Sequence, residues 1–87
     1  MMGTRYFYKD KNGNGWEHPT EKGLFKHFMN DPHMKMAHVY MQTHVMNGNK
    51  PFEIGILHKD KTEKVTYRNT ITGIFYDVRS DGSLKEW

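Results

Sequence analysis

The amino-acid sequence predicts a small α+β domain, in which an antiparallel sheet of about five strands carries one short helix on one face. Three observations support this. The chain has 87 residues, enough for a single domain spanning residues 1–87. Asn-Gly and Asp-Gly pairs separate short runs of aromatic and β-branched residues, as in β-hairpins. One segment repeats apolar residues at helical spacing.

The first predicted element is a β-hairpin. Residues 5–9 form a short aromatic run, and residues 10–15 contain two Asn-Gly pairs whose glycines supply the positive φ of a tight turn. The chain then returns through residues 16–18. This hairpin precedes the predicted helix.

The predicted helix begins after Thr20, whose hydroxyl can cap it. Glu21 lies in the first turn, where its negative charge interacts favourably with the positive end of the helix dipole. Residues 30–32, Asn-Asp-Pro, end it. A helix of about three turns is marginal alone, so we expect its apolar stripe to pack on a sheet. The stripe contains Leu24, Phe25, Phe28 and Met29.

The rest of the chain is predicted to form an antiparallel meander. Residues 37–46 alternate, with Ala37, Val39, Met41, Thr43 and Val45 on one face and His38, Tyr40, Gln42 and His44 on the other. The connections are too short for parallel crossovers, so neighbouring strands are expected to be antiparallel. The later strands are predicted at residues 52–58, 65–68, 74–78 and 83–87.

Composition indicates a folded, basic protein. A mean hydropathy of −0.90 is polar, but 14% aromatic residues is too much large apolar surface for a disordered tail. The chain has no cysteine, which excludes thiol catalysis and disulfide bonds, and we expect a cytoplasmic protein. Because the core is small, we expect an oligomer, partner or ligand to contribute to its stability. No apolar run approaches the roughly 20 residues that span a bilayer, and we expect no membrane partner.

Positive charge is concentrated in the middle of the chain. The net charge is +3, and residues 32–68 alone carry six basic and three acidic residues. Tyrosine and histidine lie in the same region, which favours RNA or another polyanion as partner, because aromatic rings stack on bases while cations contact phosphates. We expect a non-catalytic regulator or inhibitor without a cofactor, binding through an exposed sheet face. The predicted nucleic-acid-binding residues are His38, Tyr40, Gln42, His44, Lys59, Lys64, Tyr67 and Arg68.

A calcium-like motif overlaps the first turn. Asp10, Asn12, Asn14, Gly15 and Glu21 have the spacing of an EF-hand loop, and this segment alone resembles that family. The resemblance implies Asp10, Asn12, Asn14 and Glu21 as calcium ligands. An Asn-Gly hairpin leading into a capped helix explains the same residues, and we therefore predict no metal.

Two other functions fit the sequence. The protein could be an inhibitor that docks on an enzyme, for example a nuclease or a toxin, through aromatic hairpins containing Tyr6, Tyr8, Trp16 and Trp87. Its small, methionine-rich composition would suit a phage anti-defence protein. A metal-independent ribonuclease is the third interpretation, since such an enzyme needs only an acid, a base and cations. Its candidate residues are His38, Tyr40, His44, Lys64 and Arg68.

Overall fold

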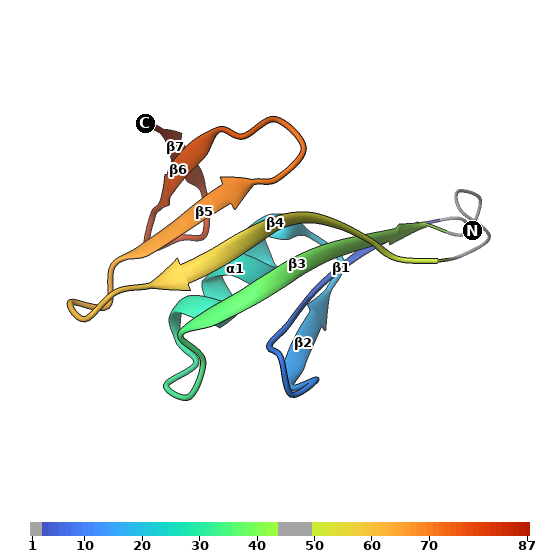
Figure 1. The fold of residues 1–87 in the computed structure, drawn as a ribbon, viewed down its shortest axis with the longest axis horizontal. Coiled ribbons are helices and arrows are strands. Elements are labelled where there is room, and N and C mark those ends of the chain that lie inside the picture. Colours follow the sequence, from blue (N-terminus) through green and yellow to red (C-terminus); the bar gives the residue numbers. More distant parts are fainter. Residues whose placement is uncertain (1–2, 44–49) are drawn as a thin grey trace.

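The computed structural model describes residues 3–43 and 50–87, which form one seven-stranded sheet with a helix against it (Figure 1). The strand order is β2-β1-β3-β4-β5-β6-β7, and every neighbouring pair is antiparallel. The elements are β1 (Thr4–Lys9), β2 (Gly15–His18), α1 (Glu21–Met29), β3 (Met36–Thr43), β4 (Phe52–Lys59), β5 (Val65–Asn69), β6 (Phe75–Val78) and β7 (Leu84–Glu86).

The prediction of an antiparallel sheet with one helix is confirmed, but the number of strands was wrong. The sheet has seven strands rather than about five, because the short β2 and β7 both pair within it at its two edges. Strands β2 and β3 flank β1 and are both antiparallel to it, so they run in the same direction. The connection between them contains α1, while β3 to β7 follow as a meander.

The helix begins and ends where the sequence predicts. The Thr20 side chain accepts a hydrogen bond from the Gly23 N–H at 3.1 Å, and Asn30 is the C-terminal cap. Helical spacing directs the apolar stripe to the sheet. Leu24, Phe25 and Phe28 are all fully buried.

The core lies between α1 and one face of the sheet, which we call the helix face. Aromatic rings from both layers meet there, with the Phe25 and Tyr67 centroids 4.7 Å apart and the Tyr8 and Phe28 rings edge to face at 5.4 Å. Aromatic side chains bury a large apolar area each, so these rings contribute strongly to the hydrophobic stabilisation of the core. The buried cluster contains Tyr8, Leu24, Phe25, Phe28, Met34, Ala37, Val39, Ile54, Leu57, Val65, Tyr67 and Val78.

Strand β3 divides its side chains between the two faces as predicted, over the part that the structure describes. Ala37 and Val39 are fully buried on the helix face, whereas His38 and Tyr40 lie on the opposite face and are half-buried. We call this opposite face the open face, since α1 packs on the other side (Figure 1). The predicted positions of His44 and Val45 lie outside the described residues.

Candidate nucleic-acid interface

The open face brings together side chains from five consecutive strands in one row. Residues directly opposite each other in antiparallel strands share a face, and their Cβ atoms are about 5 Å apart. The row therefore follows from the register, because each member is paired with the next. It runs in the order Lys9, His38, Ile56, Arg68 and Phe75, from β1 to β6.

One aromatic cluster lies on β1 and β3. The rings of Phe7 and Tyr40 are stacked with their centroids 5.4 Å apart and their planes 19° from parallel. Lys9 Nζ lies 5.4 Å from the Phe7 centroid, within the range of a cation–π contact. We call Phe7, Tyr40 and Lys9 the Phe7 cluster.

A second cluster, again of two aromatic rings and one cation, lies towards the β7 edge of the sheet. Phe75 on β6 stacks on Trp87 at 5.0 Å, and the Arg68 guanidinium lies 5.5 Å from the Phe75 centroid. Trp87 Nε1 donates to Asp77 Oδ1 at 3.0 Å, which orients the indole. Phe75 is 40% exposed and Trp87 70% exposed. We call Arg68, Phe75 and Trp87 the Phe75 cluster.

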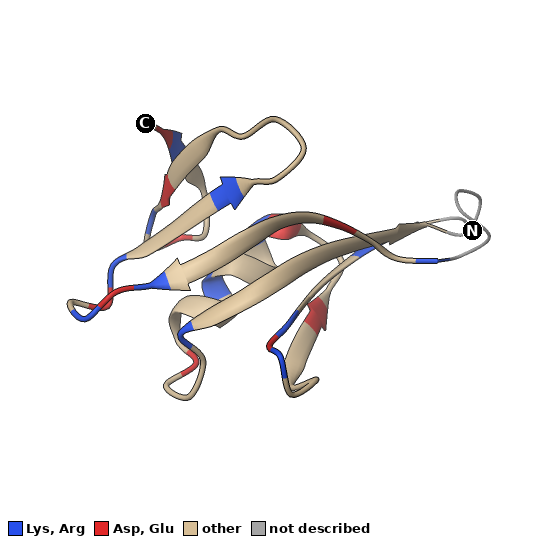
Figure 2. Ribbon diagram, in the orientation of Figure 1, with Lys and Arg blue, Asp and Glu red and all other residues tan. Residues whose placement is uncertain are grey.

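Charged groups lie mostly around the margins of the sheet. Figure 2 shows Lys, Arg, Asp and Glu chiefly at strand ends and in loops, while β3 has none. His38 Nδ1 lies 2.7 Å from Glu53 Oε1, an ion pair when the imidazole is protonated. Lys64 Nζ lies 3.7 Å from Asp77 Oδ1. The middle of the open face is therefore nearly neutral, and the cations stand beside the aromatic clusters.

Two predicted interface residues lie on the wrong face. Tyr67 is 2% exposed, packs against Phe25 and donates from its hydroxyl to the Ile54 carbonyl at 3.2 Å. Lys59 is 3% exposed, and its Nζ donates to the Asp31 carbonyl at 2.7 Å. The reason is strand alternation: adjacent residues point to opposite faces, so Tyr67 and Arg68 could not share one.

The remaining predicted residues fall into three groups. His38, Tyr40, Gln42 and Arg68 come together on the open face, as their register requires. Lys64 precedes β5, and its Nζ lies near the Asp77 carboxylate of β6. His44 lies outside the described residues.

The register also adds residues that sequence reasoning missed. Phe7, Phe75 and Trp87 were not among the predicted binding residues, although they supply three of the four rings in the two clusters. The sequence contained the information needed to find Phe7. Adjacent residues of a strand point to opposite faces, so Phe7 must lie on the face opposite the buried Tyr8. What alternation could not show was which strands are neighbours.

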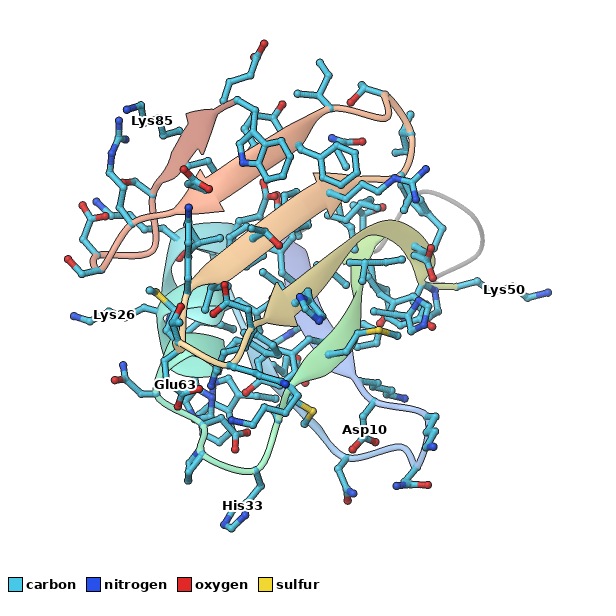
Figure 3. The ribbon with its side chains drawn as sticks, turned by 60° about the vertical axis from the view of Figure 1, so that its left-hand side comes forward. Asp10, Lys26, His33, Lys50, Glu63 and Lys85 are labelled. Carbon is cyan, nitrogen blue, oxygen red and sulfur yellow. The ribbon has the colours of Figure 1, made fainter. Side chains whose placement is uncertain are left out.

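The calcium-like loop is a hairpin turn in the structure. Asp10 Oδ1 accepts the backbone N–H groups of Asn12 and Asn14 at 2.8 and 2.9 Å, so this carboxylate oxygen holds its own turn. Glu21 lies at the start of α1, beyond the whole of β2. Figure 3 shows Asp10 on a loop that projects from the sheet. Within residues 3–43 and 50–87, no group of three or more acidic, histidine or cysteine side chains is placed to hold a metal ion.

The aromatic residues proposed for protein docking do not form one surface. Tyr8 is fully buried, and Tyr6 is half-buried against the core. Trp16 stacks on His27 of α1 at 4.0 Å, on the helix face, while Trp87 lies with Phe75 on the open face. The four side chains therefore cannot contact one partner surface together.

A hollow of about 500 Å³ adjoins the Phe7 cluster. It lies over β1, β2 and the turn between them, and its lining includes Phe7, Lys9, Gly15, Glu17 and Gln42. Gly15, which forms part of its wall, is the cross-strand partner of Lys9. Arg5 Nη1 donates to Glu17 Oε2 at 2.8 Å beside it.

Comparison of the chain with protein-family models, curated proteins and solved structures gives no match. Among the residues that the structure describes, no helix combines the length and apolar character needed to cross a bilayer.

Proposed function

We propose that this protein is a small binding module that holds single-stranded RNA on its open face and acts by occupancy, as a regulator or inhibitor. One observation carries the proposal: the uncovered face presents two stacked aromatic pairs, each with a cation against it. Aromatic faces stack on unpaired bases, and the adjacent Lys or Arg can contact the phosphates.

The spacing of the clusters supports an extended strand as the ligand. Tyr40 on β3 and Phe75 on β6 are separated by three strand-to-strand steps. At about 4.8 Å per step, this corresponds to roughly 14 Å. One base cannot cover that distance, so a chain of several nucleotides would engage both clusters and a single nucleotide only one.

The nearly neutral middle of the face also argues for single strands. A duplex buries its bases and is held chiefly through phosphates, which requires a dense field of cations. Here His38 and Lys64 are already close to carboxylates. Stacking would supply a larger share of the affinity than charge.

The test is fluorescence anisotropy with labelled single-stranded RNA of about 10 nucleotides, within the site sizes of single-strand-binding domains. Tyr40→Ala and Trp87→Ala should each weaken binding about 5- to 150-fold, the equivalent of about 1–3 kcal/mol per stacked base. Circular dichroism should show an intact fold for both variants.

His33→Ala is the control, because His33 is an exposed aromatic side chain on the loop between α1 and β3, outside both clusters and the hollow (Figure 3). It should leave RNA affinity unchanged. The proposal fails if the wild-type protein does not bind RNA at low salt, or if His33→Ala weakens binding as much as Trp87→Ala.

A second candidate function is docking on a protein, such as a nuclease or toxin. The connection between β5 and β6 exposes Ile71 (67%) and Ile74 (36%) beside Phe75, and exposed apolar clusters of this kind are typical of protein interfaces. Capture from cell lysate with and without ribonuclease separates the two functions. RNA binding predicts that all partners are lost after treatment, and protein docking predicts that one is retained.

A further inference from the structure

The hollow over the first hairpin has Gly15 in its wall, at a position that requires glycine. A Cβ on Gly15 would collide with the carbonyl oxygen of Tyr8, so no larger residue fits there without a shift of the strands. Its volume of about 500 Å³ lies in the range of sites for small organic ligands, about 300–1,000 Å³. It is continuous with the open face, because Phe7 belongs to both.

The walls of the hollow suit a nucleotide. Phe7 offers an aromatic surface for a planar base, and Lys9 places a cation beside it for a phosphate. Glu17 is the cross-strand partner of Phe7, so its carboxylate projects from the same face next to the ring. The ring would stack on the base, the cation would contact the phosphate, and the carboxylate would contact the edge of the base.

The Glu17 carboxylate is held in place by its neighbour. Arg5 Nη1 donates to Glu17 Oε2 at 2.8 Å, and among the described residues Oε1 receives no hydrogen bond. A carboxylate accepts hydrogen bonds and cannot donate them. It therefore favours the base whose edge presents the most N–H donors.

We infer that this hollow is a guanine-selective subsite of the RNA interface, an inference that rests on the proposed function. Guanine alone among the four RNA bases presents two adjacent donors, N1–H and N2–H₂, on its Watson–Crick edge, the edge that proteins read in single-stranded RNA. Glu17 accepts from this edge while Phe7 stacks on the base and Lys9 contacts its phosphate. Adenine, cytosine and uracil each offer a single donor group to the carboxylate.

The test compares two RNAs of about 10 nucleotides, one containing only uridine and one in which a single central uridine is replaced by guanosine. The wild-type protein should bind the guanosine-containing RNA at least about fivefold more tightly, the lower end of the discrimination that a well-placed base contact provides. Glu17→Gln should remove this preference by weakening the binding of the guanosine-containing RNA much more than that of the uridine-only RNA. Glu63→Gln, which alters an exposed carboxylate paired with Lys35 in a distant turn, is the control and should retain the preference.

The possible failures are distinguishable. Equal affinity of the wild-type protein for both RNAs overturns the guanine subsite and leaves the RNA-binding proposal standing. A guanosine preference that persists in Glu17→Gln also overturns the subsite, because another group must then read the base. Absence of binding to either RNA overturns the subsite and the proposed function together.

Discussion

At the scale of single residues, Gly55 shows how a missing side chain shapes the core. Gly55 lies on β4, and the ring of Tyr67 packs directly over it. A Cβ at this position would collide with ring atoms and the hydroxyl of Tyr67. The same ring contacts Phe25 on the helix, so its position sets how closely α1 approaches the sheet.

Gly55→Ala should lower the free energy of unfolding by about 1–3 kcal/mol, because the added methyl group overpacks a buried site. Urea denaturation of the wild-type and variant proteins measures this. Gly3→Ala is the control, since a Cβ there meets no atom within 4 Å. Equal stability of Gly55→Ala and wild type would show that Tyr67 does not pack on Gly55.

Two buried tyrosines should make the free energy of unfolding depend on pH in the alkaline range. Burial raises the pKa of both Tyr8 and Tyr67 well above the ordinary value of 10.0, and at Tyr8 the Asp31 carboxylate adds to the effect. The Tyr8 hydroxyl is hydrogen-bonded to His27 Nδ1 at 2.7 Å. Below pH 10 both groups are protonated in the folded and unfolded chains alike. Above it, the unfolded chain releases the protons that the folded chain retains, so stability falls as pH rises.

Each of these tyrosines should contribute a loss of up to about 1.4 kcal/mol of unfolding free energy per pH unit above 10. The double variant Tyr8→Phe, Tyr67→Phe should be less stable at neutral pH, because it lacks the hydrogen bonds of both hydroxyls, but should lose less stability between about pH 9 and pH 11. Denaturant titrations across this range compare the two slopes. Identical slopes would mean that these hydroxyls ionise as readily in the folded protein as in the unfolded chain.

At the scale of elements, the junction between β2 and α1 determines where the helix begins. The Thr20 backbone N–H donates to His18 Nδ1 at 3.1 Å, and its side chain accepts from the Gly23 N–H. The His18 ring packs against Gly23, where a Cβ would collide with it. Contacts among His18, Thr20 and Gly23 therefore fix the end of β2 against the start of α1.

Thr20→Ala should destabilise the protein by about 1 kcal/mol, because the Gly23 N–H loses its side-chain acceptor. Thr20→Ser keeps the hydroxyl and should retain most of the stability. Thermal denaturation compares the three proteins. A wild-type Tm for Thr20→Ala would show that the cap contributes nothing to folding.

At the scale of the whole molecule, the sheet separates a helix-covered face from an open one, and the proposed interface depends on this asymmetry. Exposed lysines occur on both sides of the molecule, since Lys26 projects from α1 (Figure 3) while Lys9 lies on the open face. Net charge alone would let RNA bind anywhere. Among the described residues, the open face places a Lys or Arg side chain against each of its two stacked aromatic pairs.

The salt dependence of RNA binding should therefore change with substitutions on one face only. For single strands, log K falls with log salt concentration by about 0.7 per phosphate contact. Arg68→Gln should reduce the magnitude of this slope by about 0.7 if Arg68 contacts one phosphate. Lys26→Gln should leave the slope unchanged. Anisotropy titrations at several salt concentrations measure both, and an equal effect of the two variants would contradict binding at the open face.

Much of the local structure could be predicted from the sequence. The hairpin turn at Asp10, the cap at Thr20 and the alternating faces of residues 37–42 all depend on neighbours within a few positions. Such features follow from local hydrogen bonds and from the geometry of the extended chain. The residues of the open face were predicted only in part, because Tyr67 and Lys59 were assigned to it without applying that same alternation to β4 and β5.

The sequence by itself determined the kinds of elements, their order and which residues of each strand share a face, because these depend on short-range backbone geometry. Only the tertiary structure decided that seven strands join in one sheet, that Phe7 meets Tyr40 and Phe75 meets Trp87, and that α1 covers the face carrying Tyr67. These contacts join residues from separate strands. Their formation depends on the pairing register and on packing against the helix, which no local pattern specifies.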